Sequence, residues 1–182
     1  MESFDSIVRS RSNLVFRTLS RLCGRDAGLE DLSQEVFLRL YRALPHFRGE
    51  SGLDTYLHRI VVNVAKDEWA RRRRMRRVVS LDDPDSAWPD QLTMPGDGPA
   101  DSAQQNSLLA ALDAGMARLD FEDRAILVLF FQEERTYKEI AAILDLPIGT
   151  VKTNLFRAKQ KLRDTVKEWI SPCTKASRTA GA

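Results

Sequence analysis

One segment near the C-terminus carries side chains that could bind a polyanion. The stretch "VKTNLFRAKQKLR" presents Lys152, Thr153 and Arg157 on one face, with Thr150 just before it, and adds positive charge further along at Lys159, Lys161 and Arg163. Cations of this kind pair with phosphates, and hydroxyl and guanidinium donors can also read base edges in DNA. Thr153 could also be an ordinary surface residue. The same face includes Phe156, an aromatic ring among cations.

The element that positions these side chains is a helix. Its buried stripe recurs at i, i+4, i+7 and i+11, at Val151, Leu155, Ala158 and Leu162. The stretch "TYKEIAAIL" before it predicts a helix with Thr136 as N-cap and Glu139 closing a capping box, and it buries Ile140, Ala141 and Leu144. Pro147 separates the two helices. This is the layout of a DNA-binding helix-turn-helix, although an ordinary antiparallel helix pair shares it.

A second candidate surface lies in "ESGLDTYLHRIVVNVAKDEWARRRRMRR". One face of this expected helix is apolar, with Leu53, Leu57, Ile60, Val61 and Val64. The other face presents Thr55, Arg59, Val62, Lys66, Trp69 and Arg73, flanked by Tyr56 and Asn63. Cations interleaved with aromatic rings suit nucleic acid, because a ring can stack on an unpaired base for about 1 to 3 kcal/mol. Alternatively, Trp69 and Tyr56 close the rim of the core.

A third candidate surface lies on the helix predicted by "GLEDLSQEVFLRLYRALPHF", which Pro45 ends. Its inner face gathers Leu32, Val36, Phe37, Leu40, Tyr41 and Leu44. On the opposite face Leu38 is framed by Asp31, Gln34, Glu35 and Arg42. A leucine framed by carboxylates could dock a protein, although solitary surface leucines are common.

The layout of charge divides the 182 residues, although the net charge is only +2. Six arginines fall within residues 71–77, and no Lys or Arg follows until Arg118. The stretch between is rich in Asp, Pro, Gly and Ser, which predicts a flexible acidic linker. We therefore expect an all-α protein with a helical unit at 1–78, a linker at 79–104, a second helical unit at 105–170 and a disordered tail at 171–182.

Other classes of function find little support. The apolar runs are too short to span a bilayer and the N-terminus lacks a signal peptide's apolar centre, so we expect a cytoplasmic protein without membrane insertion. Cys23 and Cys173 do not form a disulfide framework, and His46 and His58 lack metal-ligand spacing or a nucleophile partner. We expect no catalytic residue, no metal and no cofactor.

Three motifs together resemble the sigma factors of bacterial RNA polymerase, of the extracytoplasmic-function type within the sigma-70 family. The motif "DLSQEVFLRLYRAL" is similar to region 2.2, "HFRGESGLDTYLHRIVVNVAKDEWARRRR" to regions 2.3 and 2.4, and "RTYKEIAAILDLPIGTVKTNLFRAKQKLR" to region 4.2. The chain departs from the family pattern at Tyr56, where Trp is common, and at Leu53 and Asp54, which replace a frequent Ser/Phe-Arg pairing.

This resemblance implies a protein that binds core RNA polymerase and directs it to promoters, under control of an anti-sigma factor. The residues implied for docking on the clamp helices of the largest polymerase subunit are Asp31, Leu32, Gln34, Glu35 and Leu38. Those implied for recognition of the −10 element are Arg48, Tyr56, Arg59, Asn63, Lys66, Trp69, Arg72 and Arg73. Those implied for the −35 element are Thr150, Lys152, Thr153, Phe156, Arg157 and Lys159. The polymerase flap is a further implied contact for the second unit.

Two other interpretations of the sequence have less support. A free-standing regulator that binds an operator as a dimer would use the helix-turn-helix, but not the face around Leu38 or the separate basic helix. An enzyme would need a phosphate-binding glycine loop, a metal cluster or a nucleophile with its base, and the sequence has none of these motifs.

Overall fold

The computed structural model describes residues 3–24, 27–47, 49, 52–79 and 103–170, and every element in these ranges is helical. The N-terminal unit consists of α1 (Phe4–Cys23), α2 (Leu29–Ala43), the 3-10 turn η1 (Leu44–His46) and α3 (Leu53–Val79). The C-terminal unit consists of α4 (Ala103–Arg118), α5 (Phe121–Leu127), the π-helical turn η2 (Val128–Gln132), α6 (Tyr137–Leu144) and α7 (Ile148–Ile170). The predicted all-α class is confirmed.

Local sequence signals explain where several helices begin and end. Asp120 caps α5, where its carboxylate accepts a hydrogen bond from the Asp123 amide at 2.9 Å. The predicted capping box forms at the start of α6, with Thr136 and Glu139 satisfying each other's backbone amides. α2 gives way to the 3-10 turn just before Pro45, as expected. The predicted start of α3 at Ser51 lies outside the described residues, and the helix is described from Leu53.

The helix-turn-helix is present as α6, a short turn and α7. Asp145 ends α6 with a left-handed backbone (φ 56°), which reverses the chain, and Pro147 precedes the first residue of α7. The amide of Leu146 donates to the carbonyl of Ala141 at 3.0 Å, which closes the end of α6. The turn is therefore tight enough to set α7 at an angle across α6.

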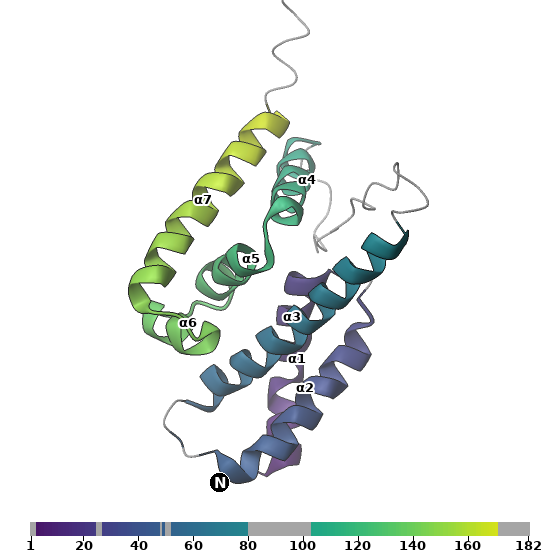
Figure 1. Ribbon diagram of the computed structural model, residues 1–182, viewed down its shortest axis with the longest axis vertical. Coiled ribbons are helices and arrows are strands. Elements are labelled where there is room, and N and C mark those ends of the chain that lie inside the picture. The colour runs from purple at the N-terminus through teal and green to yellow at the C-terminus, as the bar shows by residue number, and fades with distance from the viewer. Residues whose placement is uncertain (1–2, 25–26, 48, 50–51, 80–102, 171–182) are drawn as a thin grey trace, which may run out of the picture.

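The two units pack against each other (Figure 1). α1, α2 and α3 form a three-helix bundle, and in the C-terminal unit α7 lies along α4 and α5. α6 packs on α3, and the buried apolar side chains of both units form one continuous cluster. Of the predicted linker at 79–104, only its two ends fall within described helices, because α3 extends to Val79 and α4 begins at Ala103.

Candidate nucleic-acid interface

The face of α7 opposite the core is open to solvent. Val151, Leu155 and Ala158 are buried against α5 and α6, which confirms the predicted stripe, and Leu162 packs at its edge. Phe156 is 63% exposed, so an aromatic ring does lie on the outer face. The further residues exposed on this face are Lys152, Thr153, Arg157 and Lys159.

Three polar groups on this face of α7 have partners within the chain. Lys152 Nζ lies 5.8 Å from the ring centre of Tyr137, and Lys159 Nζ lies 5.7 Å from that of Phe131. The hydroxyl of Thr153 donates to the Gly149 carbonyl at 3.0 Å, which leaves its oxygen free only to accept. Thr150 is half-buried in the first turn. Both lysines thus lie over aromatic rings and are still exposed residues, as phosphate binding requires.

The basic face of α3 is partly exposed and partly covered. Arg59, Asn63 and Lys66 are exposed, whereas Tyr56 is half-buried with its ring 5.0 Å from that of Phe47. Trp69 is half-buried too. Arg48, which the resemblance also implies for this face, lies outside the described residues.

Trp69 packs toward the C-terminal unit. Its ring lies 6.2 Å from that of Phe121, and the guanidinium of Arg73 lies 5.3 Å above it. Tyr56 and Trp69 therefore both close the rim of the core, as the alternative interpretation of the sequence predicted.

Two residues expected on the outer face of α3 are in fact buried. Thr55 is 7% exposed and Val62 is 3% exposed. For Val62 the reason is the C-terminal unit, since Val62 lines a shared cleft with Ile143 and Leu144 of α6. The periodicity of α3 shows which side chains share a face, but it does not show that a second unit packs on that face.

Part of the arginine run is neutralised within α3. Glu68 is 6% exposed and accepts hydrogen bonds from Arg71 at 2.7 and 2.8 Å and from Arg72 at 2.6 Å. These arginines lower the pKa of Glu68, principally through the hydrogen bonds from Arg71 and against the effect of burial. Arg72 also reaches the carbonyl of Cys23 at 3.5 Å. Arg72 is therefore more committed to the fold than Arg73, which remains exposed.

The α2 face forms a shallow groove with α1. Asp31, Gln34, Glu35 and Leu38 all line it, and Leu38 is 43% exposed as predicted. Leu32 instead packs against the core. The groove has members that sequence reasoning missed: Phe4, Val8, Phe37 and Tyr41.

Tyr41 corrects the predicted inner face of α2. It is 60% exposed, and its ring meets the edge of Phe4 at 5.1 Å between centres. The buried stripe of α2 is narrower than predicted, because α1 crosses close to Val36 and Leu40 and leaves Tyr41 at the margin. The rings of Phe4 and Tyr41 thus border the α2 groove.

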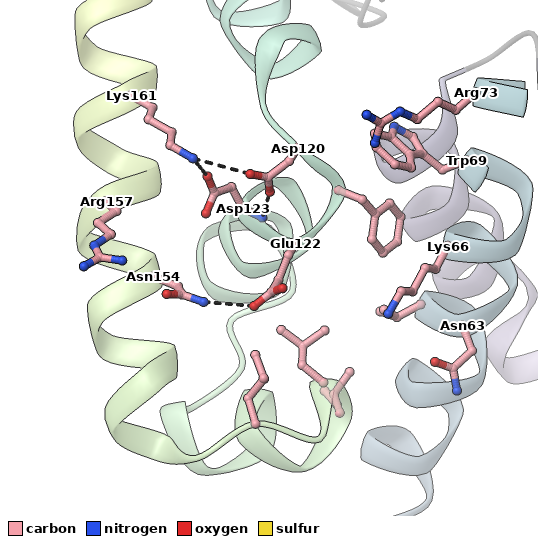
Figure 2. Close-up of a pocket in the computed structure, with 15 residues that line it drawn as sticks. Asn63, Lys66, Trp69, Arg73, Asp120, Glu122, Asp123, Asn154, Arg157 and Lys161 are labelled. Carbon is pink, nitrogen blue, oxygen red and sulfur yellow. Dashed lines mark hydrogen bonds and ion pairs between the residues drawn. The ribbon is translucent and has the colours of Figure 1, made fainter. Parts of the chain in front are cut away.

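A cleft of about 540 Å³ separates the α3 face from the C-terminal unit. Figure 2 shows Asn63, Lys66, Trp69 and Arg73 on one side. The opposite side carries Asp120, Glu122, Asp123, Asn154, Arg157 and Lys161. Lys161 pairs with Asp120 and Asp123, and the amide nitrogen of Asn154 donates to Glu122 at 2.9 Å. Candidate −10 and −35 residues therefore line one cleft.

A buried carboxylate joins the two units. The side chain of Glu133 is 1% exposed and forms ion pairs of 2.9 Å with both Arg17 and Arg21 of α1. Burial by itself would raise the pKa of Glu133, but the neighbouring His58 and Arg17 outweigh that effect and lower the pKa to about 2. Arg17 and Glu133 are 116 residues apart in the sequence. No local sequence pattern could therefore have predicted this cluster.

Within the described residues no group of His, Cys, Asp and Glu could hold a metal ion, and no helix is long and apolar enough to cross a membrane. The arrangement offers charged and aromatic surfaces on α3 and α7 and an acidic apolar groove on α2. These surfaces suit binding to a polyanion and to protein.

Both helical units match known protein families. The family described as Sigma-70 region 2 matches residues 7–75, and Sigma-70, region 4 matches residues 109–162. The ECF RNA polymerase sigma-E factor of Escherichia coli K12 is 33% identical, over 77% of this chain and 74% of its own length. The RNA polymerase sigma-E factor of Streptomyces antibioticus is 30% identical, over 90% of this chain and 84% of its own length.

The ECF RNA polymerase sigma factor SigE of Mycolicibacterium smegmatis is 36% identical over 90% of this chain, which spans only 62% of that relative's length. Among solved structures, the sigma factor RpoE in complex with the anti-sigma factor NepR from Bartonella quintana has a TM-score of 0.67 at 20% identity, covering 90% of this chain and 96% of that one. CnrH in complex with the cytosolic domain of CnrY has a TM-score of 0.62 at 19% identity, covering 91% and 88%. These structures share the fold.

Proposed function

Because the chain belongs to the extracytoplasmic-function group of the sigma-70 family, we propose that it binds core RNA polymerase in the cytoplasm and directs initiation at promoters with −10 and −35 elements. The observation that carries the proposal is the presence of both sigma regions, in order, on the two helical units of the chain. A free-standing operator-binding regulator would account for the second unit alone.

We assign the DNA contacts to the exposed faces of α7 and α3. On α7, Lys152, Arg157 and Lys159 would bind phosphates or base edges of the −35 duplex, with Thr150, Thr153 and Phe156 beside them. On α3, Arg59, Asn63, Lys66, Trp69 and Arg73 would hold the melted −10 strand, with Arg48, Tyr56 and Arg72 at its margins. Trp69 can stack on a base only if it leaves Phe121, so the proposal requires the two units to separate on the promoter.

We assign polymerase docking to the α2 groove, where Leu38 stands among Asp31, Gln34 and Glu35. Carboxylates around an apolar centre fit a basic protein surface, such as the clamp helices of the largest subunit. The C-terminal unit would contact the polymerase flap. Regulation by an anti-sigma factor is part of the proposal, and its support is the fold shared with the sigma factor RpoE, which was solved with the anti-sigma factor NepR.

Run-off transcription with purified core polymerase on genomic DNA fragments tests the proposal and yields the promoter. We expect discrete transcripts only when the chain is added. Absence of both transcription and core binding in the reconstituted mixture would refute it. Once a promoter is known, a duplex containing only its −35 element separates the role of α7 from that of α3.

A further inference from the structure

We propose that the free chain adopts a closed state in which Glu133 fastens the C-terminal unit to α1, and that this closure withholds the α3 face from single-stranded DNA. The first part concerns the conformation of the chain alone. The second part rests on the proposed function, because it takes the α3 face to be a DNA surface.

The carboxylate of Glu133 has its partners in the other unit. Arg17 Nη2 and Arg21 Nη1 each lie 2.9 Å from one of its two oxygens, and His58 Nε2 of α3 lies 3.6 Å away. The His58 ring is fully buried, and its Nδ1 donates to the Asp54 carbonyl at 2.7 Å, so its Nε2 is the atom that faces Glu133. A carboxylate buried this deeply is costly without such partners. Closure is therefore the state in which Glu133 is both buried and satisfied.

A cation of the C-terminal unit also spans this junction. Arg124 of α5 is 3% exposed and donates to the carbonyl of Leu22 at 3.0 Å, at the C-terminal end of α1. It also donates to Met116 at 3.0 Å and to Ala117 at 3.3 Å, at the end of α4. One guanidinium thus satisfies carbonyls at the ends of two helices from different units. The C-terminal unit thus buries two charged side chains, Glu133 and Arg124, whose partners across the junction lie on the N-terminal unit.

The closed arrangement places the C-terminal unit directly opposite the cations of α3. Lys66 and Arg73 line the cleft together with Asp120, Glu122 and Asp123 (Figure 2). A DNA strand would have to enter this cleft past the C-terminal unit, where Asp120 and Asp123 already pair with Lys161, and the ring of Trp69 packs against Phe121. The α2 groove lies outside the cleft and remains exposed. The closed chain can therefore present its polymerase-docking face while it hides its single-strand surface.

The conformational part is tested by small-angle X-ray scattering of the free full chain. We expect a larger radius of gyration for Glu133→Gln than for wild type, whereas Glu134→Gln, at the exposed neighbouring residue, should scatter as wild type does. Circular dichroism checks that helix content is kept. If Glu133→Gln loses helix content, the double variant Arg17→Gln/Arg21→Gln replaces it. A radius equal to that of wild type in a helical variant would overturn the proposed fastening.

The functional part is tested by the fluorescence anisotropy of a labelled single-stranded oligonucleotide of random sequence. We expect Glu133→Gln to bind about tenfold tighter, because apparent affinity scales with the open fraction, and Lys66→Ala in that background to reverse the gain. An opened chain that binds no tighter would refute the withholding of α3. If wild type and variants all failed in run-off transcription, the proposed function would fall, while the scattering result would stand.

Discussion

The buried Glu133 predicts a defined dependence of stability on pH. Its carboxyl has an ordinary pKa of 4.5, and its pKa in the folded chain is about 2. Since one pKa unit corresponds to about 1.4 kcal/mol, ionisation of Glu133 should contribute about 3 kcal/mol to the free energy of unfolding at pH 7. Arg17 is half-exposed, and solvent screening will reduce this figure toward about 2 kcal/mol.

The sign follows from the lowered pKa. The unfolded chain protonates Glu133 before the folded chain does, so the contribution is complete above about pH 4.5 and is lost as the pH falls toward 2. At pH 3 less than half should remain. The charged or titratable groups that face the carboxylate are Arg17, Arg21 and His58.

The assay is urea unfolding of the wild-type chain and Glu133→Gln between pH 3 and pH 7. The difference in unfolding free energy should be about 2 to 3 kcal/mol at pH 7 and should shrink as the pH falls below 4.5. Glu134→Gln, which alters an exposed carboxylate, should follow the wild-type curve. A difference that is absent at pH 7, or constant across the range, would show that Glu133 is not held by charged partners.

Three further outcomes are expected. Arg124→Lys keeps the charge but cannot reach both helix ends, so it should lower the unfolding free energy by about 2 kcal/mol in urea titrations; a loss below about 0.5 kcal/mol would contradict its bridging role. Arg157→Ala should weaken binding to a −35 duplex and reduce the logarithmic salt slope by about 0.9, while Lys167→Ala, further along α7, should leave the slope nearly unchanged; an unaltered slope for Arg157→Ala would place that side chain away from phosphates. Leu38→Asp should reduce capture of core polymerase at least tenfold without loss of helix content, since Leu38 is 43% exposed; full capture would move the docking site elsewhere.

The sequence was sufficient to predict caps and buried faces wherever the residues involved lie within a few turns of one helix. Thr136 and Glu139 lie within one helical turn, so their capping box could be predicted, and the same is true of the stripe from Val151 to Ala158 on α7. The exposure of Phe156 and Leu38 followed from the same periodicity. Helical period and caps determine which face of a single helix is apolar.

Contacts between helices could not be predicted from the periodicity of single helices. Val62 sits on the predicted outer face of α3, but α6 covers it. Tyr41 was expected inside and is exposed, because the crossing of α1 determines the width of the stripe on α2. The partners of Glu133 come from two helices far away in the sequence, and one sequence without related chains contains no signal that pairs them.

The π-helical turn at Val128–Gln132 determines which way Glu133 points. The amide of Glu133 donates to the carbonyl of Val128, five residues back, at 3.0 Å, so this turn holds one residue more than a regular α-helical turn. One residue rotates an α-helix by about 100°. Deletion of a single codon here would swing Glu133 away from Arg17 and Arg21 without changing any charged residue. Related genes could thus gain or lose the closed state through one small insertion or deletion, so its presence in a homologue should be judged from the length of this turn as well as from its charges.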